Sequence, residues 1–537
     1  MAIFTTFTIA DLYIPTIFTL TTIFLYQYII YPTIISPLSK VPNAHWSCAI
    51  SPAWILRARF ESRENRTLHA AHQHHGPVVR IGPNELSVNS TEGVKAIYQG
   101  GFDKHRWYSV FDNYGVPCTF SALASKHHSL RKRMVAHVYS KSHIQASPAL
   151  SRQARAILNA HLLPALRSPQ APRGVDVHSL FCAAAADFIT AYCFGLSRSA
   201  GFVRRRAAYR EHWLALYATR AGHGFFAQEL AALDRTLGCL GLGLTPPWAQ
   251  AATRELEAWC RQLSDAAVRM LEDDEAGAEA LGTADDPVVV RALLAGIERE
   301  AGARGEQSPL YATAVRQRGL TVASEVLDHV LAGQETTGVA LTYLSYQLSR
   351  SVSLQRELRE ELLALTPSAR LDAGGRVRVP DSRQLDGLPI LHAVIMETVR
   401  RYAPAGGPEP RVTPSPCLIG PYEVPRGVRV SASAYNLHRN EAAFPDPERW
   451  DHTRWLGRRE GDGKSDVDRH FWGFSSGGRM CLGSNFAMHD MKLIIAAIYS
   501  NYTTHIVDDE GIEPTDAYTG HPKSNSLYLR FERIVED

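Results

Sequence analysis

The sequence predicts a mainly α-helical protein with a minor β component, preceded by a single N-terminal transmembrane helix. Three observations support this fold class: a long uncharged run near the N-terminus, helical patterns over most of the chain after residue 126, and short strand-like runs in a Pro- and Gly-rich region after Pro404. Hydrophobic residues make up 45% of the 537 positions, which excludes disorder over most of the chain. The net charge of +3 gives no indication of nucleic acid as a partner. The eight cysteines contain no C-x-x-C pair that would indicate a zinc site.

The apolar run from Leu12 to Ile35 contains no charged residue. As a helix it would span about 36 Å, enough to cross a hydrocarbon core of ~30 Å. A cleaved signal peptide would need a basic start, which this N-terminus lacks. We therefore predict a membrane anchor at 1–36 and one folded domain at 37–537, with a buried core hairpin as the alternative for the run. Basic residues such as Lys40 follow the run, so the positive-inside tendency places the domain on the cytoplasmic side.

The domain is predicted to open with a β-hairpin at 78–89, where apolar residues alternate around a Gly-Pro turn. The acid-rich segment 272–286 is interpreted as a solvated loop between helices. The remaining elements follow in chain order: a long helix at about 321–350, a helix at about 388–402, strands near 417–424 and 428–435, and a last helix from about Cys481 to Tyr499.

The segment from Phe474 to Gly483 carries the most specific pattern in the chain. Its Cys481 precedes a helix, whose N-terminal amides and dipole favour an anionic thiolate. Gly477 and Gly483 allow a flat ligand to approach the backbone closely. Phe474 can shield the sulfur, and Arg479 can reach an anionic edge of the ligand. A thiolate in such a loop is a strong axial ligand for haem iron, whereas the alternative interpretation is a buried structural cysteine in a tight turn.

This loop resembles the haem-binding signature of the cytochrome P450 family, the haem-thiolate monooxygenases, which reads Phe-x-x-Gly-x-Arg-x-Cys-x-Gly. The resemblance covers essentially the whole chain, and residues 76–90 look most like fungal microsomal members of secondary metabolism. It implies the cytochrome P450 fold, haem b as the cofactor and Cys481 as the axial ligand of its iron.

Residues 332–337 (AGQETT) are similar to a second motif of this family and lie about 145 residues before the cysteine. Small side chains at Ala332 and Gly333 let a helix pass against a flat cofactor. The resemblance implies that Glu335 and Thr336 are the catalytic acid–alcohol pair that delivers protons. Taken alone, the hexapeptide is equally compatible with an ordinary small-residue helix contact.

A third mark is the pair Glu397 and Arg400, whose i, i+3 spacing places both charges on one helix face. In the resembled family such a pair is buried and held by a second arginine from a downstream segment. Two candidates exist in this chain, Arg449 and Arg454, and we favour Arg454. The expected role of this triad is structural, because it holds the fold around the haem.

The resemblance also implies basic residues that neutralise the haem propionates. Arg411 matches the arginine of the strand after the Glu-x-x-Arg helix, and His128 and Lys132 occupy the positions of a second basic set upstream. Arg131 and Arg133 are then expected to face outward or toward a partner. The alternative is that this upstream set is only a basic surface helix.

The implied activity is a haem-dependent monooxygenase that inserts an oxygen atom from dioxygen into a small hydrophobic organic substrate by hydroxylation, epoxidation or several oxidations. We expect a single-pass protein of the endoplasmic reticulum membrane. The chain carries no flavin or nicotinamide fingerprint, so electrons are expected from an NADPH-dependent cytochrome P450 reductase, with cytochrome b5 as a second candidate partner. An isomerase or dehydratase that does not use dioxygen and a non-enzymatic haem-binding sensor are the alternatives. Substrate contacts are expected from segments 105–120, 215–245, 320–335 and 403–410.

Overall fold

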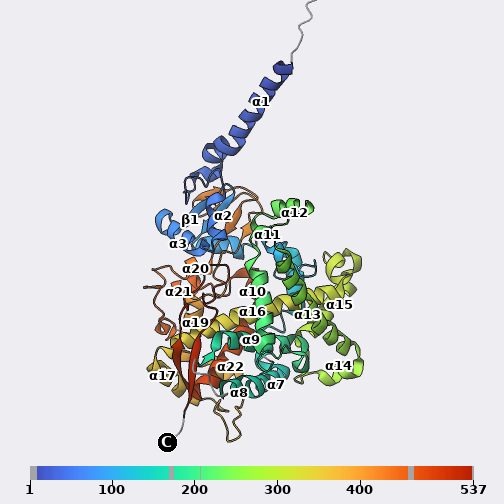
Figure 1. The fold of residues 1–537 in the computed structure, drawn as a ribbon, viewed down its shortest axis with the longest axis vertical. Helices are drawn as coiled ribbons and strands as arrows, with labels where there is room; N and C mark the ends of the chain where they lie inside the picture. The colour runs from blue at the N-terminus through green and yellow to red at the C-terminus, as the bar shows by residue number, and fades with distance from the viewer. Residues whose placement is uncertain (1–8, 168–173, 206, 458–464, 535–537) are drawn as a thin grey trace, which may run out of the picture.

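The structure, a computed structural model, describes residues 9–167, 174–205, 207–457 and 465–534. Helices dominate these residues and strands are few, as the sequence predicts. A helical rod formed by α1 (Ile9–Leu25) and η1 (Tyr26–Ile35) projects away from the body of the molecule (Figure 1). The part from Pro15 to Ile35 is long and apolar enough to cross a membrane, and almost none of it is buried against the protein. It is therefore a candidate transmembrane span.

The last turn of this rod is attached to the body by one arginine. Arg80 lies on β1 (Val78–Gly82) and is completely buried. Its guanidinium donates hydrogen bonds to the carbonyl oxygens of Pro32 at 2.8 Å and Pro83 at 2.7 Å. A buried guanidinium needs such acceptors because it cannot lose its proton. The C-terminal end of the apolar rod is thus held against strand β1 by Arg80.

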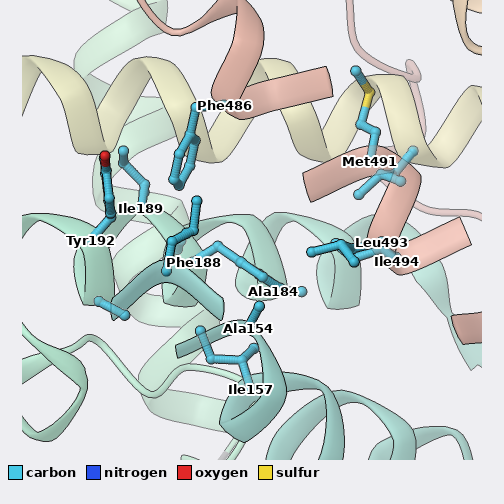
Figure 2. Packing of buried hydrophobic residues seen from close by; sticks show 14 of the residues in the cluster. Ala154, Ile157, Ala184, Phe188, Ile189, Tyr192, Phe486, Met491, Leu493 and Ile494 are labelled. Atoms are coloured by element: carbon cyan, nitrogen blue, oxygen red, sulfur yellow. The ribbon is translucent and has the colours of Figure 1, made fainter. Parts of the chain in front are cut away.

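The core of the body is a set of packed helices. Residues of α7 (Pro148–Ile157), α9 (Val177–Phe194) and α22 (Ser484–Tyr499) interdigitate in Figure 2, and α9 runs along the long helix α16 (Arg318–Ser349). Helix α9 is also apolar enough to cross a membrane, but it is 89% buried, so it is a core helix. Gly338 of α16 permits this close packing, since a Cβ there would lie 2.5 Å from the sulfur of Cys182 on α9.

The other helices surround this core. Those before α16 are α2 (Ala53–Phe60), α3 (Glu64–His75), α4 (Thr91–Val94), α5 (Ser125–Val135), α6 (Lys141–Ala146), α8 (Leu163–Arg167), α10 (Ala207–Gly222), α11 (Phe225–Glu229), α12 (Ala231–Cys239), α13 (Pro247–Glu272), α14 (Asp274–Ala280) and α15 (Val288–Arg304). Those after it are α17 (Val352–Leu363), α18 (Ser382–Asp386), α19 (Pro389–Arg401), α20 (Ala434–Leu437) and α21 (Asp466–His470). The three predicted helices at the C-terminal half are confirmed as α16, α19 and α22, with their ends displaced by a few residues.

The described residues form three small sheets beside the helical body. The largest has the strand order β1-β2-β8-β5-β3, with β2 (Glu85–Val88), β3 (Asp103–Lys104), β5 (Arg411–Val412) and β8 (Arg429–Ser431). The others are β4 (Val175–Asp176) with β9 (Tyr502–Asp508) and β10 (Tyr528–Arg533), and the pair β6 (Cys417–Ile419) and β7 (Tyr422–Val424). The predicted hairpin is confirmed as antiparallel β1 and β2. Strand β8 is shorter than predicted because Ser433 caps α20 by accepting a hydrogen bond from the Asn436 amide.

The interpretation of residues 272–286 as a solvated loop is wrong in its middle part. Helix α14 occupies Asp274–Ala280, where alanine and glutamate, both good helix formers, dominate the sequence. The end of the segment is also not solvated, because the buried carboxylate of Asp286 accepts hydrogen bonds from the Gly282 amide and from Arg291. The number of charged residues in the segment does not reveal its helix propensity or the contacts of Asp286.

Candidate functional site

A cavity of about 840 Å³ separates α16 from the loop that precedes α22. Phe474 and Cys481 line it on the loop side, and Ala332, Gly333 and Thr336 line it on the α16 side. Residues of the two motifs therefore line one cavity. A cavity of this size can hold a large planar cofactor together with part of a ligand.

The cysteine loop is closed by a hydrogen bond from the Cys481 amide to the carbonyl oxygen of Phe474 at 2.9 Å. Gly477 begins the short helical turn η10 (Gly477–Arg479) with a φ of 72°, and a Cβ at this position would lie 2.3 Å from the carbonyl oxygen of Tyr98. Glycine is required there by the protein's own backbone. Gly483 is different, because no atom lies within 4 Å of its missing Cβ. A flat ligand can therefore approach the backbone at Gly483.

The side chain of Cys481 is exposed, and it is exposed to the cavity. Enclosure in the cavity raises the pKa of its thiol, while the backbone amides of Gly483 and Ser484 and the charge of Lys132 act to lower the pKa. The two amides belong to the N-terminus of α22, which favours a negative charge. A positive metal ion bound to the sulfur would outweigh the effect of burial and hold the thiolate form.

Two basic side chains fasten the loop that carries Cys481. The guanidinium of Arg479 donates to the carbonyl oxygens of Ala122 at 2.6 Å and Leu123 at 2.5 Å. The ammonium of Lys132 on α5 donates to the carbonyl oxygens of Gly478 at 3.0 Å and Met480 at 3.2 Å. Both residues also line the cavity, so their positive charge lies along its edge.

Three further basic residues lie close to this pair. In the register of β3 and β5, Lys104 stands directly opposite Arg411, although like charges opposed in this way normally repel. Arg411 is buried, donates to the Tyr108 hydroxyl at 3.2 Å and has one carboxylate partner, Glu409, at 3.3 Å. Lys104 is buried as well, and its pKa is lowered well below the usual value by burial and by Arg411 and Arg479.

His128 completes this set, which we call the basic cluster: Lys104, His128, Lys132, Arg411 and Arg479. Burial and the neighbouring cations lower the pKa of His128 to about 3. Lys104 was not predicted from the sequence, since a single lysine in a two-residue strand carries no motif; only its pairing with Arg411 reveals it. His128 is therefore neutral near pH 7 and can act only as a hydrogen-bonding group, while the closely placed Lys132, Arg411 and Arg479 supply the positive charge that indicates an anionic ligand.

The prediction that Arg131 faces outward or toward a partner is wrong. Its side chain is buried, lies 3.3 Å from the Glu325 carboxylate of α16 and donates to the Thr313 hydroxyl at 2.9 Å. Arg133, two positions further along α5, is exposed as expected. The helical period explains the difference, because residues two apart point to different sides of the helix.

On the α16 side, Glu335 and Thr336 line the cavity but make separate contacts. The Thr336 hydroxyl donates to the carbonyl oxygen of Ala332 at 2.7 Å. The Glu335 carboxylate accepts a hydrogen bond from the hydroxyl of Tyr217 on α10 at 2.5 Å and another from the hydroxyl of Thr519 at 3.3 Å. Burial raises the pKa of Glu335. Tyr217 lies in segment 215–245, from which substrate contacts were predicted, but its contact with Glu335 was not predicted. Thr519 was not predicted as a site residue, and both residues lie more than a hundred positions from Glu335.

Glu397 and Arg400 on α19 are completely buried and form two hydrogen bonds of 2.8 Å with each other. Arg454 lies 3.6 Å from Glu397, while Arg449 is 69% exposed and lies 4.0 Å from Asp451. Arg400 also donates to backbone carbonyl oxygens of the loop before η9 (His452–Trp455), at Pro447 and at Arg449 itself. The pair therefore holds that loop in place, with the side chain of Arg454 and not that of Arg449 beside it.

Comparisons with known proteins agree with this geometry. Residues 319–528 match the family model described as Cytochrome P450. The cytochrome P450 monooxygenase ucsK of an Acremonium species is 28% identical over 452 residues, which cover 80% of this chain and 79% of the relative. The cytochrome P450 monooxygenase orf2 of Aspergillus niger is 24% identical and covers 91% of each chain, and the N-acetyltryptophan 6-hydroxylase of Emericella nidulans is 24% identical and covers 92% of each.

The family implies haem with a cysteine thiolate ligand, and the residues of the cavity fit such a group. Cys481 and Gly483 line the cavity, and Gly483 leaves the backbone there open. Lys132 and Arg479 line it too and supply positive charge for carboxylates, while Arg411 of the basic cluster is buried behind the lining residues. Opposite, the exposed face of Ala332 offers a flat apolar surface.

Proposed function

We propose that this chain, whose residues 319–528 form a cytochrome P450 domain and whose homologues are fungal cytochrome P450 monooxygenases, is a haem b-dependent monooxygenase of small organic substrates. Cys481 would hold the haem iron through its sulfur, and the basic cluster would pair with the haem propionates. When bound, the haem supplies activation of dioxygen and oxidation of a C–H bond or alkene. The observation that carries the proposal is that Cys481, Glu335 and Thr336 line one cavity.

Glu335 and Thr336 are proposed to move protons into this cavity. Thr336 holds its hydroxyl toward the cavity by donating to Ala332, which leaves its oxygen free to accept a hydrogen bond from water. Burial raises the pKa of Glu335, which makes its carboxyl group easier to protonate than a solvent-exposed carboxyl group. Tyr217 and Thr519 hold this carboxyl group in position.

The N-terminal segment 1–36 is proposed to anchor the domain 37–537 in the endoplasmic reticulum membrane, with the body on the cytoplasmic side. The exposed apolar span from Pro15 to Ile35 supports this placement. An NADPH-dependent cytochrome P450 reductase, with cytochrome b5 as a second candidate, would then supply electrons from the same side of the membrane. The hydroxylase activity in the name of the Emericella nidulans relative supports hydroxylation in secondary metabolism as the type of reaction.

The experiment that tests this function combines genetics with isotope labelling. The metabolite that accumulates after deletion of the gene is incubated with the purified haem-loaded protein, a reductase and NADPH under ¹⁸O₂. Incorporation of one labelled oxygen atom, dependent on NADPH and reductase, is the expected result. Turnover without dioxygen would identify the isomerase or dehydratase alternative, and ligand binding with no turnover would identify the sensor.

A further inference from the structure

The distribution of charge in the cavity bears on the class of substrate. Most charged groups that line it are already satisfied by the protein. Arg59, for example, contacts Glu64 at 2.8 Å, Glu85 at 2.5 Å and Glu229 at 3.0 Å, and the members of the basic cluster surround the position proposed for the cofactor carboxylates. Arg220, on α10, belongs to neither group.

The guanidinium of Arg220 donates one hydrogen bond to a neutral side chain, and its other terminal nitrogen has no acceptor among the described residues. Its Nη2 donates to the side-chain oxygen of Asn113 at 2.7 Å, and Asn113 is itself buried and donates from Nδ2 to the carbonyl oxygen of Ser324 on α16 at 3.0 Å. The Nη1 of Arg220 is enclosed by the protein, yet no hydrogen-bond acceptor reaches it among the residues that the structure describes. No carboxylate of that part of the chain lies within 4 Å of the guanidinium either. Arg220 thus brings to the cavity wall a permanent positive charge that no carboxylate of the described residues neutralises, which suits an anionic ligand.

The position of Arg220 relative to the catalytic pair follows from its helix. It lies three residues after Tyr217 on the same face of α10, and Tyr217 contacts Glu335. Through Asn113, Arg220 is tied to the level of Ser324, three turns before Thr336 on α16. That separation corresponds to about 18 Å along the helix axis. Apolar side chains, among them Phe111, Phe120 and Leu331, line the same cavity.

From these contacts we propose that Arg220 binds the carboxylate of an otherwise apolar substrate, which is oxidised at a carbon remote from that carboxylate. The proposal rests on the proposed function and names the substrate class of the same site. A guanidinium with free N–H donors matches the two oxygens of a carboxylate in geometry and charge. The apolar part of the molecule then extends along α16 toward Thr336.

The carboxyl group of Asp328 opposes this binding, so variants can be designed both to weaken and to strengthen the binding of an acid. Asp328 lines the same cavity on α16, and its carboxyl group interacts electrostatically with Arg220. An ionised Asp328 repels a bound carboxylate, so its removal should strengthen the binding of an acid. A substrate held only by apolar contacts would respond to neither change.

The test measures dissociation constants of the full-length holoenzyme by equilibrium dialysis, with two matched pairs as probes: dodecanoic acid and its methyl ester, and 4-phenylbutanoic acid and its methyl ester. We expect each acid to bind more tightly than its ester. Arg220→Met should weaken the acids about tenfold or more and leave the esters unchanged, and Arg220→Lys should keep part of the preference. Asp328→Asn should tighten the acids, whereas Arg269→Met, at an exposed position of α13, should change nothing.

Equal affinity of acid and ester for the wild-type protein, or equal weakening of both by Arg220→Met, would overturn the proposal. Dialysis measures binding without turnover, so the carboxylate site at Arg220 and the proposed monooxygenase function can be contradicted independently of each other. Arg220-dependent binding of acids without incorporation of oxygen would contradict the proposed function alone. Oxygen incorporation without any preference for acids would contradict the carboxylate site alone.

Discussion

The basic cluster and the α16 side of the cavity differ in how their charges are balanced. In the basic cluster, the carboxylate contacts among the described residues are those of Arg411 with Glu409 at 3.3 Å and of Arg479 with Asp103 at 4.0 Å. On the α16 side the carboxyl group of Glu335 is matched by two hydroxyl groups, and Arg220 by a single amide. The first arrangement suits a constant anionic cofactor, and the second suits protons and a variable substrate. The difference teaches that several cations with few carboxylate partners favour an anionic ligand, while a carboxyl group held by hydroxyl groups favours a role in which its protonation changes.

The largest expected effect concerns the buried pair Glu397–Arg400, which we expect to hold the fold around the cavity. Glu397→Gln leaves the buried guanidinium of Arg400 without its charged partner, at a cost of about 3–5 kcal/mol. We expect little or no folded, haem-loaded protein, measured by the yield of holoprotein and by thermal unfolding. Arg449→Met is the control, because this side chain is exposed and distant from Glu397. A Glu397→Gln variant as stable as the control would contradict the structural role of the pair.

The second prediction separates the α16 side from the basic cluster. Thr336→Ala should reduce product formation by a factor of roughly 10²–10⁴, the usual contribution of a positioned proton-transfer group, while NADPH oxidation continues and peroxide appears. Haem content should not change, because the threonine hydroxyl bonds only to its own helix among the described residues. The measurement is product formed per NADPH oxidised. Parallel loss of haem and of NADPH oxidation would show that Thr336 merely packs against the cofactor.

The converse prediction concerns the basic cluster. Arg479→Met and Lys104→Met should each weaken haem retention by about tenfold, the effect of one lost charge-assisted hydrogen bond, with the ratio of product to NADPH unchanged in the protein that stays loaded. Haem transfer to an apo-acceptor protein measures the retention. Arg133→Met, exposed on α5, is the matched control. If Lys104→Met behaves like this control, Lys104 does not contact the cofactor.

The smallest expected effect lies outside the cavity. Deletion of residues 1–36 should release the body from membranes and leave haem binding intact. The deletion removes the Pro32 acceptor of Arg80, so we expect a loss of about 1 kcal/mol in stability. A deletion of residues 1–25 keeps Pro32 and should retain full stability. Fractionation at high salt and thermal unfolding measure both effects, and a 1–36 deletion that stays wholly in the membrane pellet would contradict the anchor.

Sequence reasoning was most accurate where chemistry imposes fixed offsets along the chain. Cys481, Arg479 and Gly477 form one short loop, and the family that this loop predicted is confirmed by the match over residues 319–528. The extent of α16 and the hairpin at β1 and β2 followed from apolar periodicity, which needs only local sequence.

The remainder depends on contacts between distant segments. Lys104 meets Arg411 only through the pairing of two-residue strands, and Tyr217 and Thr519 reach Glu335 from separate parts of the chain. Arg131 was misplaced because its buried partner, Glu325, lies 194 positions away. Such pairings are set by the packing of helices, which local charge and periodicity do not encode.

The central claim is that Cys481 binds the haem iron, and the absorption spectrum of the reduced carbon-monoxide complex tests it most directly. The wild-type protein is expected to show the long-wavelength band typical of thiolate-ligated haem, and Cys481→Ser to lose that band. Cys182→Ser, at a buried cysteine on α9, should keep the band. If Cys481→Ser retains the thiolate band, Cys481 is not the ligand and the account of the cavity is wrong.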